Sequence, residues 1–120
     1  MRRKYLKDRC EKRQLAKCED VCKTFDEVQY AAADYLSGLD VVKEIRCNVW
    51  LEGLGLDKEY TSDFVCVRTD GGLMVRECVF RKHIVKPMTA QLLEASRNYW
   101  EKRGCLDWGI IVDEDKTRFN

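Results

Sequence analysis

Two carboxylates in strand-like segments are the side chains of this chain best suited to chemistry. If the segment LMVRECVF (73–80) is a β-strand, its side chains alternate between two faces, and Glu77 shares a face with Val75 and Val79. That face is the more apolar of the two. An ionised carboxylate there costs free energy unless it is paired, hydrogen-bonded or bound to a cation. Glu77 is therefore a candidate functional residue.

The second carboxylate is Asp63, which stands just ahead of an apolar run. Pairing of the two segments through the turn TDGG (69–72) predicts that Asp63 lies roughly opposite Val79 and diagonal to Glu77. Two carboxylates from adjacent strands can share a divalent cation, and hard oxygen ligands suit Mg²⁺ or Mn²⁺. The structural alternative is that Asp63 caps the strand entrance and Glu77 pairs with a lysine at the sheet edge.

Changes of hydrophobic period predict the elements that position these carboxylates. Residues 24–37 carry apolar side chains at helical spacing and stop at Gly38, with Thr24 and Glu27 as an expected capping box. Residues 41–80 then change to β-branched and aromatic residues, interrupted by two breaks that contain glycine. We expect three strands there, joined by short turns into an antiparallel meander.

A second helix and a last strand follow the only proline of the chain. Apolar residues form a stripe along residues 88–103, with Thr89 as the expected cap and Gly104 as the stop. The short apolar run LDWGIIV (106–112) is long enough for one strand. Because a strand–helix–strand crossover in one sheet is parallel and right-handed, this strand should lie parallel to residues 73–80. The order α-β-β-β-α-β predicts an α/β fold, a mixed sheet flanked by helices.

Charge is distributed unevenly along the chain. Residues 1–23 hold nine Lys and Arg against four Asp and Glu, so this segment carries +5 and the rest of the chain −4. We divide the chain into a basic N-terminal arm or helix (1–23) and one folded domain (24–120). A basic arm on a mildly acidic body could contact nucleic acid, whereas the alternative is a solvated helix without a ligand.

The seven cysteines and the absence of an apolar leader favour a reducing, cytoplasmic location with free thiols. Cys18 and Cys22 are the only closely spaced pair, and a closed zinc site needs two further ligands. His83 is the only histidine. We therefore favour buried or incidental cysteines over a thiolate metal site. No run of about 18 apolar residues occurs, so we expect no membrane partner.

The order of elements and the position of the acids resemble the PD-(D/E)XK nuclease superfamily. Segments 25–42, 59–72, 77–100 and 103–114 are more closely similar to the nuclease domain of TnsA-like heteromeric transposase endonucleases. The resemblance implies a restriction-endonuclease-like fold and metal-assisted hydrolysis of phosphodiesters at DNA ends, with Mg²⁺ or Mn²⁺. Carried over by position, it implies Asp63 and Glu77 as metal ligands and Glu27 as the helix acid of the site.

The chain departs from this family where such nucleases carry a lysine two residues after the strand acid. Here that position is Val79, which cannot orient a water molecule or offset charge on a phosphate. Arg81, Lys82 or Lys86 could supply the missing cation, and we include Lys82 among the candidate catalytic residues. In the resembled transposases a further C-terminal domain contacts partner subunits, and we expect this chain to act without one, as one subunit of a larger machine.

Two functions from different classes follow. The first is a TnsA-like endonuclease subunit that acts on DNA with a transposase or another protein subunit, or as a homodimer; Asp63 and Glu77 favour it. The second is a nuclease-fold protein that has lost catalysis and acts by binding, as a transposase assembly factor or as an inhibitor or adaptor of a mobile element. Val79 favours the second.

Overall fold

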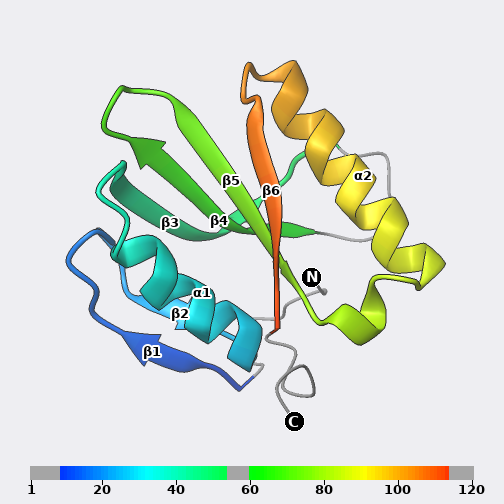
Figure 1. Ribbon diagram of the computed structural model, residues 1–120, viewed down its shortest axis with the longest axis horizontal. Coiled ribbons are helices and arrows are strands. Elements are labelled where there is room, and N and C mark those ends of the chain that lie inside the picture. Colours follow the sequence, from blue (N-terminus) through cyan, green and yellow to red (C-terminus); the bar gives the residue numbers. More distant parts are fainter. Residues whose placement is uncertain (1–8, 54–59, 114–120) are drawn as a thin grey trace, which may run out of the picture.

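The computed structural model of the protein describes residues 9–53 and 60–113. Its centre is a mixed four-stranded sheet with two helices, next to a small two-stranded sheet (Figure 1). The α/β class and the flanking helices agree with the sequence prediction. The strands of the main sheet lie in the order β3-β4-β5-β6 and comprise β3 (Val42–Trp50), β4 (Thr61–Arg68), β5 (Leu73–Val79) and β6 (Asp107–Val112).

The pairing of these strands confirms the predicted meander and the crossover. Strands β3, β4 and β5 are antiparallel in sequence order, and β6 pairs with β5 in parallel. The turn between β4 and β5 is closed by a hydrogen bond from the Arg68 N–H to the Gly72 carbonyl at 2.8 Å. Gly71 has φ 89°, a conformation that a residue without Cβ adopts at little cost.

Helix α1 (Glu27–Ser37) ends at Gly38 as expected, but it begins differently. The N-cap is Asp26, whose Oδ1 accepts from the Gln29 N–H at 2.8 Å, while Gln29 Oε1 accepts from the Phe25 N–H at 2.8 Å. The predicted capping box of Thr24 and Glu27 is therefore wrong. The same kind of capping bond forms two residues later along the chain. Asp26 has an extended backbone, and its side chain accepts a hydrogen bond from the N–H of the third helical residue.

Helix α2 (Pro87–Lys102) follows a short 3-10 turn, η1 (Arg81–His83). Lys86 is the N-cap and Pro87 opens the helix, which suits a residue with fixed φ and no N–H. The prediction of Thr89 as the cap is wrong, since Thr89 lies inside the helix and is buried. Gly104, with φ 84°, follows the C-terminus as expected.

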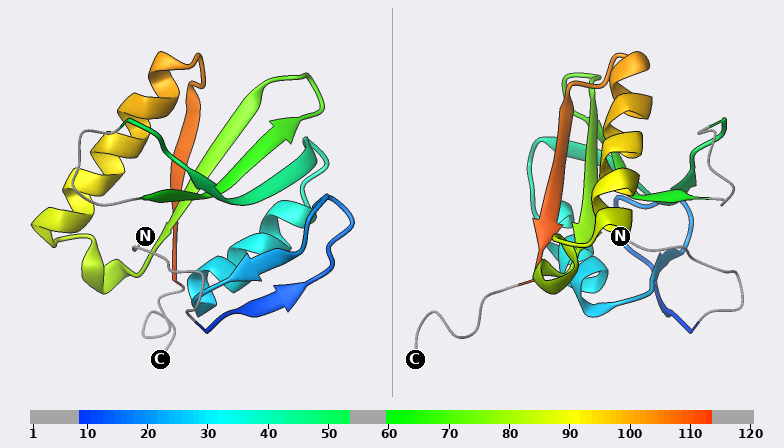
Figure 2. Two further views of the ribbon diagram at one scale, coloured as in Figure 1. Left: turned by 180° about the vertical axis from the view of Figure 1, so that it is seen from behind. Right: turned by 90° about the vertical axis from the view of Figure 1, so that its right-hand side faces the viewer.

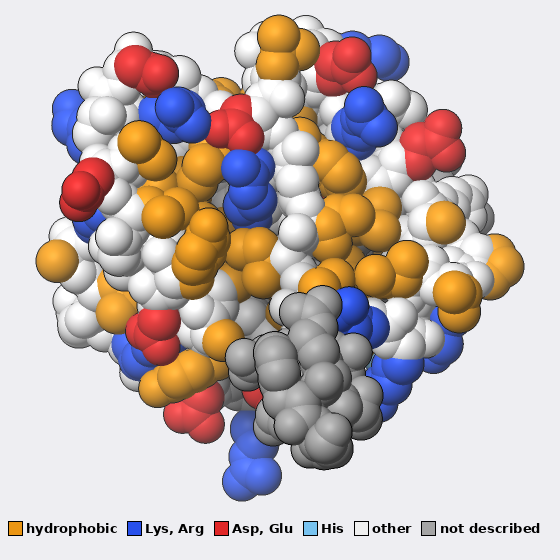
Figure 3. Space-filling model, viewed as in Figure 1, with side chains coloured by type: hydrophobic (Ala, Val, Ile, Leu, Met, Phe, Trp, Pro, Cys, Tyr) orange, Lys and Arg blue, Asp and Glu red, His pale blue; other side chains and the backbone are white. Residues whose placement is uncertain are grey.

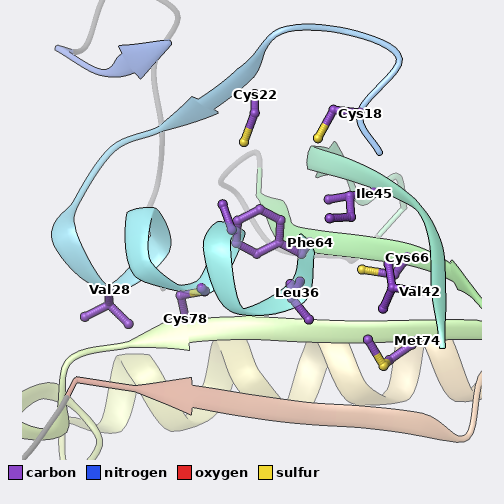
Figure 4. Packing of buried hydrophobic residues seen from close by; sticks show 12 residues of the cluster. Cys18, Cys22, Val28, Leu36, Val42, Ile45, Phe64, Cys66, Met74 and Cys78 are labelled. Atoms are coloured by element: carbon purple, nitrogen blue, oxygen red, sulfur yellow. The ribbon is translucent and has the colours of Figure 1, made fainter. Parts of the chain in front are cut away.

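The two helices lie on opposite sides of the sheet, and each covers one hydrophobic core. Alternation along β4 and β5 sends one set of side chains to α1 and the other to α2. Figure 4 shows the α1 side, with Phe64 and Leu36 between helix and sheet and α2 behind β5. The α2 side contains Val65, Val75, Val79, Leu93 and Trp100.

The N-terminal part of the described chain is not helical, so of the two predicted alternatives, an arm or a helix, the helix does not apply to residues 9–23. Strands β1 (Glu11–Arg13) and β2 (Cys22–Thr24) pair antiparallel and lie beside α1 (Figure 2). β2 spans the domain boundary predicted at residue 24. Cys18 and Cys22 are buried in the α1-side core and anchor the segment. Residues 1–8 of the predicted arm lie outside the described residues.

Two basic residues of this segment are engaged within the fold. The Arg13 guanidinium bonds Asp34 Oδ1 at 2.7 Å and lies 3.6 Å from the centroid of the Tyr30 ring. Lys17 Nζ donates to the Leu39 carbonyl at 2.7 Å. Since these cations hold the N-terminal segment against α1 and the loop after it, they contribute to the fold as well as to the local charge.

The surface mixes charged and apolar side chains. On the face seen in Figure 3, apolar side chains gather near the centre and charged ones surround them. Strands β3 and β6 are the two edges of the main sheet. Within residues 9–53 and 60–113, none of the helices has the length and apolar character needed to cross a membrane.

Candidate functional site

The two predicted carboxylates are brought together between β4 and β5. The strand register pairs Phe64 with Arg76, which places Asp63 next to Glu77 rather than opposite Val79 as predicted. The turn closed by Arg68 and Gly72 is tighter than we assumed, and this accounts for the error. The Asp63 N–H donates to Glu77 Oε1 at 2.7 Å, and the Cys78 N–H donates to Asp63 Oδ2 at 2.7 Å. Each carboxylate therefore binds the backbone of the other strand.

Glu77 receives two further hydrogen bonds from serine hydroxyls. Ser62 Oγ donates to Glu77 Oε2 at 2.7 Å, and Ser96 Oγ donates to the same oxygen. Ser62 precedes Asp63 on β4, whereas Ser96 comes from the buried face of α2. The carboxylate thus connects two strands of the sheet to the helix that covers them.

Two indole groups hold the serines in place. Trp100 Nε1 donates to Ser62 Oγ at 2.9 Å, and Trp108 Nε1 donates to Ser96 Oγ at 3.0 Å. Each serine accepts from an indole and donates to Glu77, so both hydroxyls have a defined direction. The resulting network joins β4, β5, α2 and β6. Buried networks in which the polar groups have partners fix the relative positions of the elements they join.

Burial governs the electrostatics of the pair. Glu77 is 0% exposed and Asp63 is 2% exposed. Removal from water, and then the negative charge of Asp63, raise the pKa of Glu77 to about 7, against the opposing effect of the hydrogen bonds from Ser96, Asp63 and Ser62. At neutral pH the Glu77 carboxyl is therefore close to the midpoint of its titration.

Tyr60 lies beside both carboxylates. Its pKa is raised by burial and then by the charges of Glu77 and Asp63. Within the described residues, its hydroxyl is a buried oxygen that finds no hydrogen-bond partner. A buried hydroxyl without a partner costs free energy, so it marks the least satisfied polar position around the carboxylate pair.

The residues of this site do not fit a hydrated Mg²⁺ or Mn²⁺ as they are arranged. A carboxylate offers about four lone-pair positions, and protein donors occupy three of those on Glu77. Mg²⁺ needs a near-octahedral set of oxygens and usually keeps several waters. A Glu77 side chain with no exposed surface leaves no room for them. Ion binding would require Ser62 or Ser96 to give up its bond to the carboxylate.

The other predicted site residues lie elsewhere. Glu27 is the first residue of α1; it is exposed and lines an open surface pocket with Arg9 and Tyr30. Lys82 is exposed on η1, with Nζ 5.5 Å from the centroid of the Phe80 ring. In the described part of the chain, the one group of at least three Cys, His, Asp or Glu side chains that gathers its ligand atoms consists of cysteines. Glu27 therefore does not form a cluster with Asp63 and Glu77.

Val79, the position at which the resembled nucleases carry a lysine, is part of the hydrophobic core. Val79 is 1% exposed and packs in the α2-side core with Leu93 and Trp100. A lysine there would place its ammonium group under α2. The valine is thus explained by packing between β5 and the helix.

Sequence reasoning missed the serines that satisfy Glu77. Ser96 stands on the apolar stripe of α2 between Leu93 and Trp100, and a serine at a buried helical position signals a buried hydrogen-bond partner. Ser62 gave no comparable signal, because it depends on the β4–β5 register.

No protein-family model matches this sequence, and no curated protein is significantly similar to it.

Proposed function

We propose that this protein is a nuclease-fold domain that acts by binding, in which Asp63 and Glu77 stabilise the fold and do not form a metal centre. The element order and the acids on adjacent strands support kinship with PD-(D/E)XK nucleases of the TnsA type. The observation that carries the proposal is the state of Glu77, which is fully buried and accepts three hydrogen bonds from protein donors.

The burial of Val79 supports the same proposal. A catalytic cation must reach the phosphate that is attacked, and the strand position that provides it in related nucleases is covered by α2 here. Lys82, the substitute considered from sequence, extends from η1 over the ring of Phe80. We assign Lys82 a role in contacting DNA phosphates rather than in hydrolysis.

The segment around η1 is the described surface best suited to DNA. Lys82 and Lys86 are exposed there, and both lower the pKa of His83, after its desolvation, because their positive charges lie close to it. Basic side chains gather at the lower right of Figure 3, where η1 lies in Figure 1. Helix α2 begins at Pro87, shortly after this turn, and has no side-chain cap, so the N–H groups that follow Pro87 in its first turn can also donate to a phosphate.

A protein subunit is the second partner that we propose. Apolar residues interrupt the basic ones in the same segment, with Val85 86% exposed and Met88 51% exposed. Charged and apolar groups side by side suit a surface that contacts DNA and protein together. By its resemblance to TnsA-like subunits, the chain would join a transposase, with the assembly supplying whatever cleavage the domain lacks.

Salt dependence of DNA binding tests the proposed surface. We expect the double variant Lys82→Ala/Lys86→Ala to bind duplex DNA more weakly and to make the negative slope of log K against log salt shallower by about two, because each lost phosphate contact reduces its magnitude by about 0.9. The matched control is Lys43→Ala/Lys102→Ala, which removes the same charge from exposed positions on β3 and at the end of α2. Equal slopes for the two double variants would reject the η1 surface.

The cleavage assay tests the absence of catalysis. Incubation of supercoiled plasmid with the wild-type protein and Mg²⁺ or Mn²⁺ should leave the plasmid intact. Cleavage that disappears in Asp63→Asn or Glu77→Gln would contradict the proposal, since both substitutions keep the shape of the side chain and remove the carboxylate.

A metal-dependent endonuclease is the second candidate function. Two observations favour it: the carboxylates of Asp63 and Glu77 lie on adjoining strands and interact, and the Tyr60 hydroxyl beside them has no partner within the described residues. Under this candidate, cleavage requires the partner subunit to rearrange the Ser62 and Ser96 bonds. Loss of cleavage in Lys82→Ala would then identify Lys82 as the migrated cation.

A further inference from the structure

Three cysteines that are distant in sequence meet between the N-terminal segment and the main sheet. Cys18 precedes β2, Cys22 opens β2 and Cys47 belongs to β3. Their sulfur atoms all lie within 4.8 Å of one another, and Cys47 Sγ is 3.2 Å from Cys22 Sγ. Figure 4 shows Cys18 and Cys22 directed from the N-terminal segment toward the sheet. Sequence spacing could not reveal the third member.

The separation of the sulfurs suits a thiophilic metal. Zinc binds thiolates at about 2.3 Å, so two sulfurs of one tetrahedral site lie about 3.8 Å apart. The Cys22–Cys47 separation is 3.2 Å and no separation in the cluster exceeds 4.8 Å, so small shifts would bring the three sulfurs to this spacing. Soft thiolate ligands select Zn²⁺ and similar ions over Mg²⁺. The cluster therefore differs in kind from the carboxylate pair.

Hydrogen bonding and burial act differently on the three thiols. Hydrogen bonding from Cys47, together with the nearby Arg13, lowers the pKa of Cys22 to about 7. Burial and the neighbouring Cys22 raise the pKa of Cys18 to about 11, and Cys22 and burial raise that of Cys47. A metal ion would replace the protons that these sulfurs share.

One member of the cluster borders a surface pocket. Cys47 is only partly buried and lines a surface pocket. The lining includes Glu19, Asp20 and Glu44, and Arg46 is the cation among the lining residues. Acidic side chains that line a pocket beside the cysteines attract a divalent ion.

We propose that Cys18, Cys22 and Cys47 form a zinc-binding site, with three thiolate ligands and a water molecule as the fourth. The bound ion clips the β1–β2 sheet to β3 of the main sheet. This site is independent of the proposed function, because it lies on the α1 side of the sheet and uses none of the residues around Glu77.

Cadmium binding to the reduced, metal-free protein is the test. We expect one Cd²⁺ per chain, with the near-ultraviolet charge-transfer absorbance of three thiolates, and competition by Zn²⁺. Cys47→Ser should weaken binding at least tenfold. The matched control is Cys10→Ser, which changes a cysteine of similar partial burial outside the cluster and should bind as the wild type does.

A second readout on the wild-type protein covers the case in which Cys47→Ser does not fold. Because a metal ion binds cysteine as the thiolate, binding of one ion should release protons, measurable with a pH indicator. No charge-transfer band at millimolar Cd²⁺, or equal binding by folded Cys47→Ser, would overturn the proposal. Recovery of the chain lighter by two hydrogens, with a Cys22–Cys47 disulfide and no bound metal, would also overturn it.

Discussion

The Glu77 carboxylate accepts hydrogen bonds from donors on β4 and α2. The effect of a substitution at Glu77 on the free energy of unfolding should therefore depend on which of these donors it leaves unpaired. Glutamine can keep an oxygen toward the Asp63 N–H and turn its amide toward the oxygens of Ser62 and Ser96. We expect Glu77→Gln to change the free energy of unfolding at pH 5 by less than about 1 kcal/mol.

Alanine at the same position leaves these donors without an acceptor and opens a cavity. We expect Glu77→Ala to cost roughly 3–5 kcal/mol of unfolding free energy at pH 5. Urea denaturation of both variants checks this. If alanine cost no more than glutamine, the network around Glu77 would contribute little to stability.

The raised pKa of Glu77 predicts how stability depends on pH. Below about pH 4.5 the carboxyl is protonated in both the folded and the unfolded chain. As pH rises toward 7 the unfolded chain ionises while the folded chain keeps its proton, so the folded state loses stability across this window. The loss is on the order of 3 kcal/mol, and it levels off above pH 7.

Comparison with Glu77→Gln isolates this contribution, because the other titrating groups are common to both proteins. Unfolding free energies at pH 5 and pH 8 should show the glutamine variant gaining on the wild type by an amount of that order. A constant difference between the two proteins would mean that Glu77 titrates near its usual pKa in the folded chain.

At the scale of elements, the start of α1 separates a structural acid from an exposed one. Asp26 accepts the Gln29 N–H, whereas Glu27 is exposed next to it. Asp26→Ala should lower the free energy of unfolding by about 1 kcal/mol, the usual loss for an N-cap. Glu27→Ala serves as the control and should stay within about 0.5 kcal/mol. Thermal unfolding of both variants measures these losses. A larger loss for Glu27→Ala than for Asp26→Ala would instead support the predicted capping box of Thr24 and Glu27.

Elements with a strong local signal were predictable, and elements held by distant contacts were not. Neighbouring residues determine the glycine turn at 71, the end of α1 at Gly38 and the apolar stripe of α2. The β1–β2 pairing depends on Cys18 and Cys22 reaching a core formed by later segments, so the local pattern only showed charge. For the same reason the sequence placed Asp63 near Glu77 but not the serines that complete the network.

At the scale of the whole molecule, each face of the sheet packs against one helix, and Val79 belongs to the face under α2. Val79→Lys would bury an ammonium group under α2, where Glu77 already has protein partners. We expect a loss of at least about 3 kcal/mol in unfolding free energy and no gain of DNA cleavage. Val85→Lys, at a position 86% exposed, is the matched control and should be nearly neutral. A stable Val79→Lys that cuts plasmid would contradict this assignment.

Binding of Mn²⁺ tests most directly the central claim that the Asp63–Glu77 pair is structural. Mn²⁺ is a hard ion that avoids the thiolate cluster, and the loss of its free electron paramagnetic resonance signal reports each bound ion. We predict that at millimolar Mn²⁺ the wild-type protein and Asp63→Asn retain the same free signal. Binding of one Mn²⁺ per wild-type chain that is lost in folded Asp63→Asn and Glu77→Gln would contradict the claim and identify a metal centre.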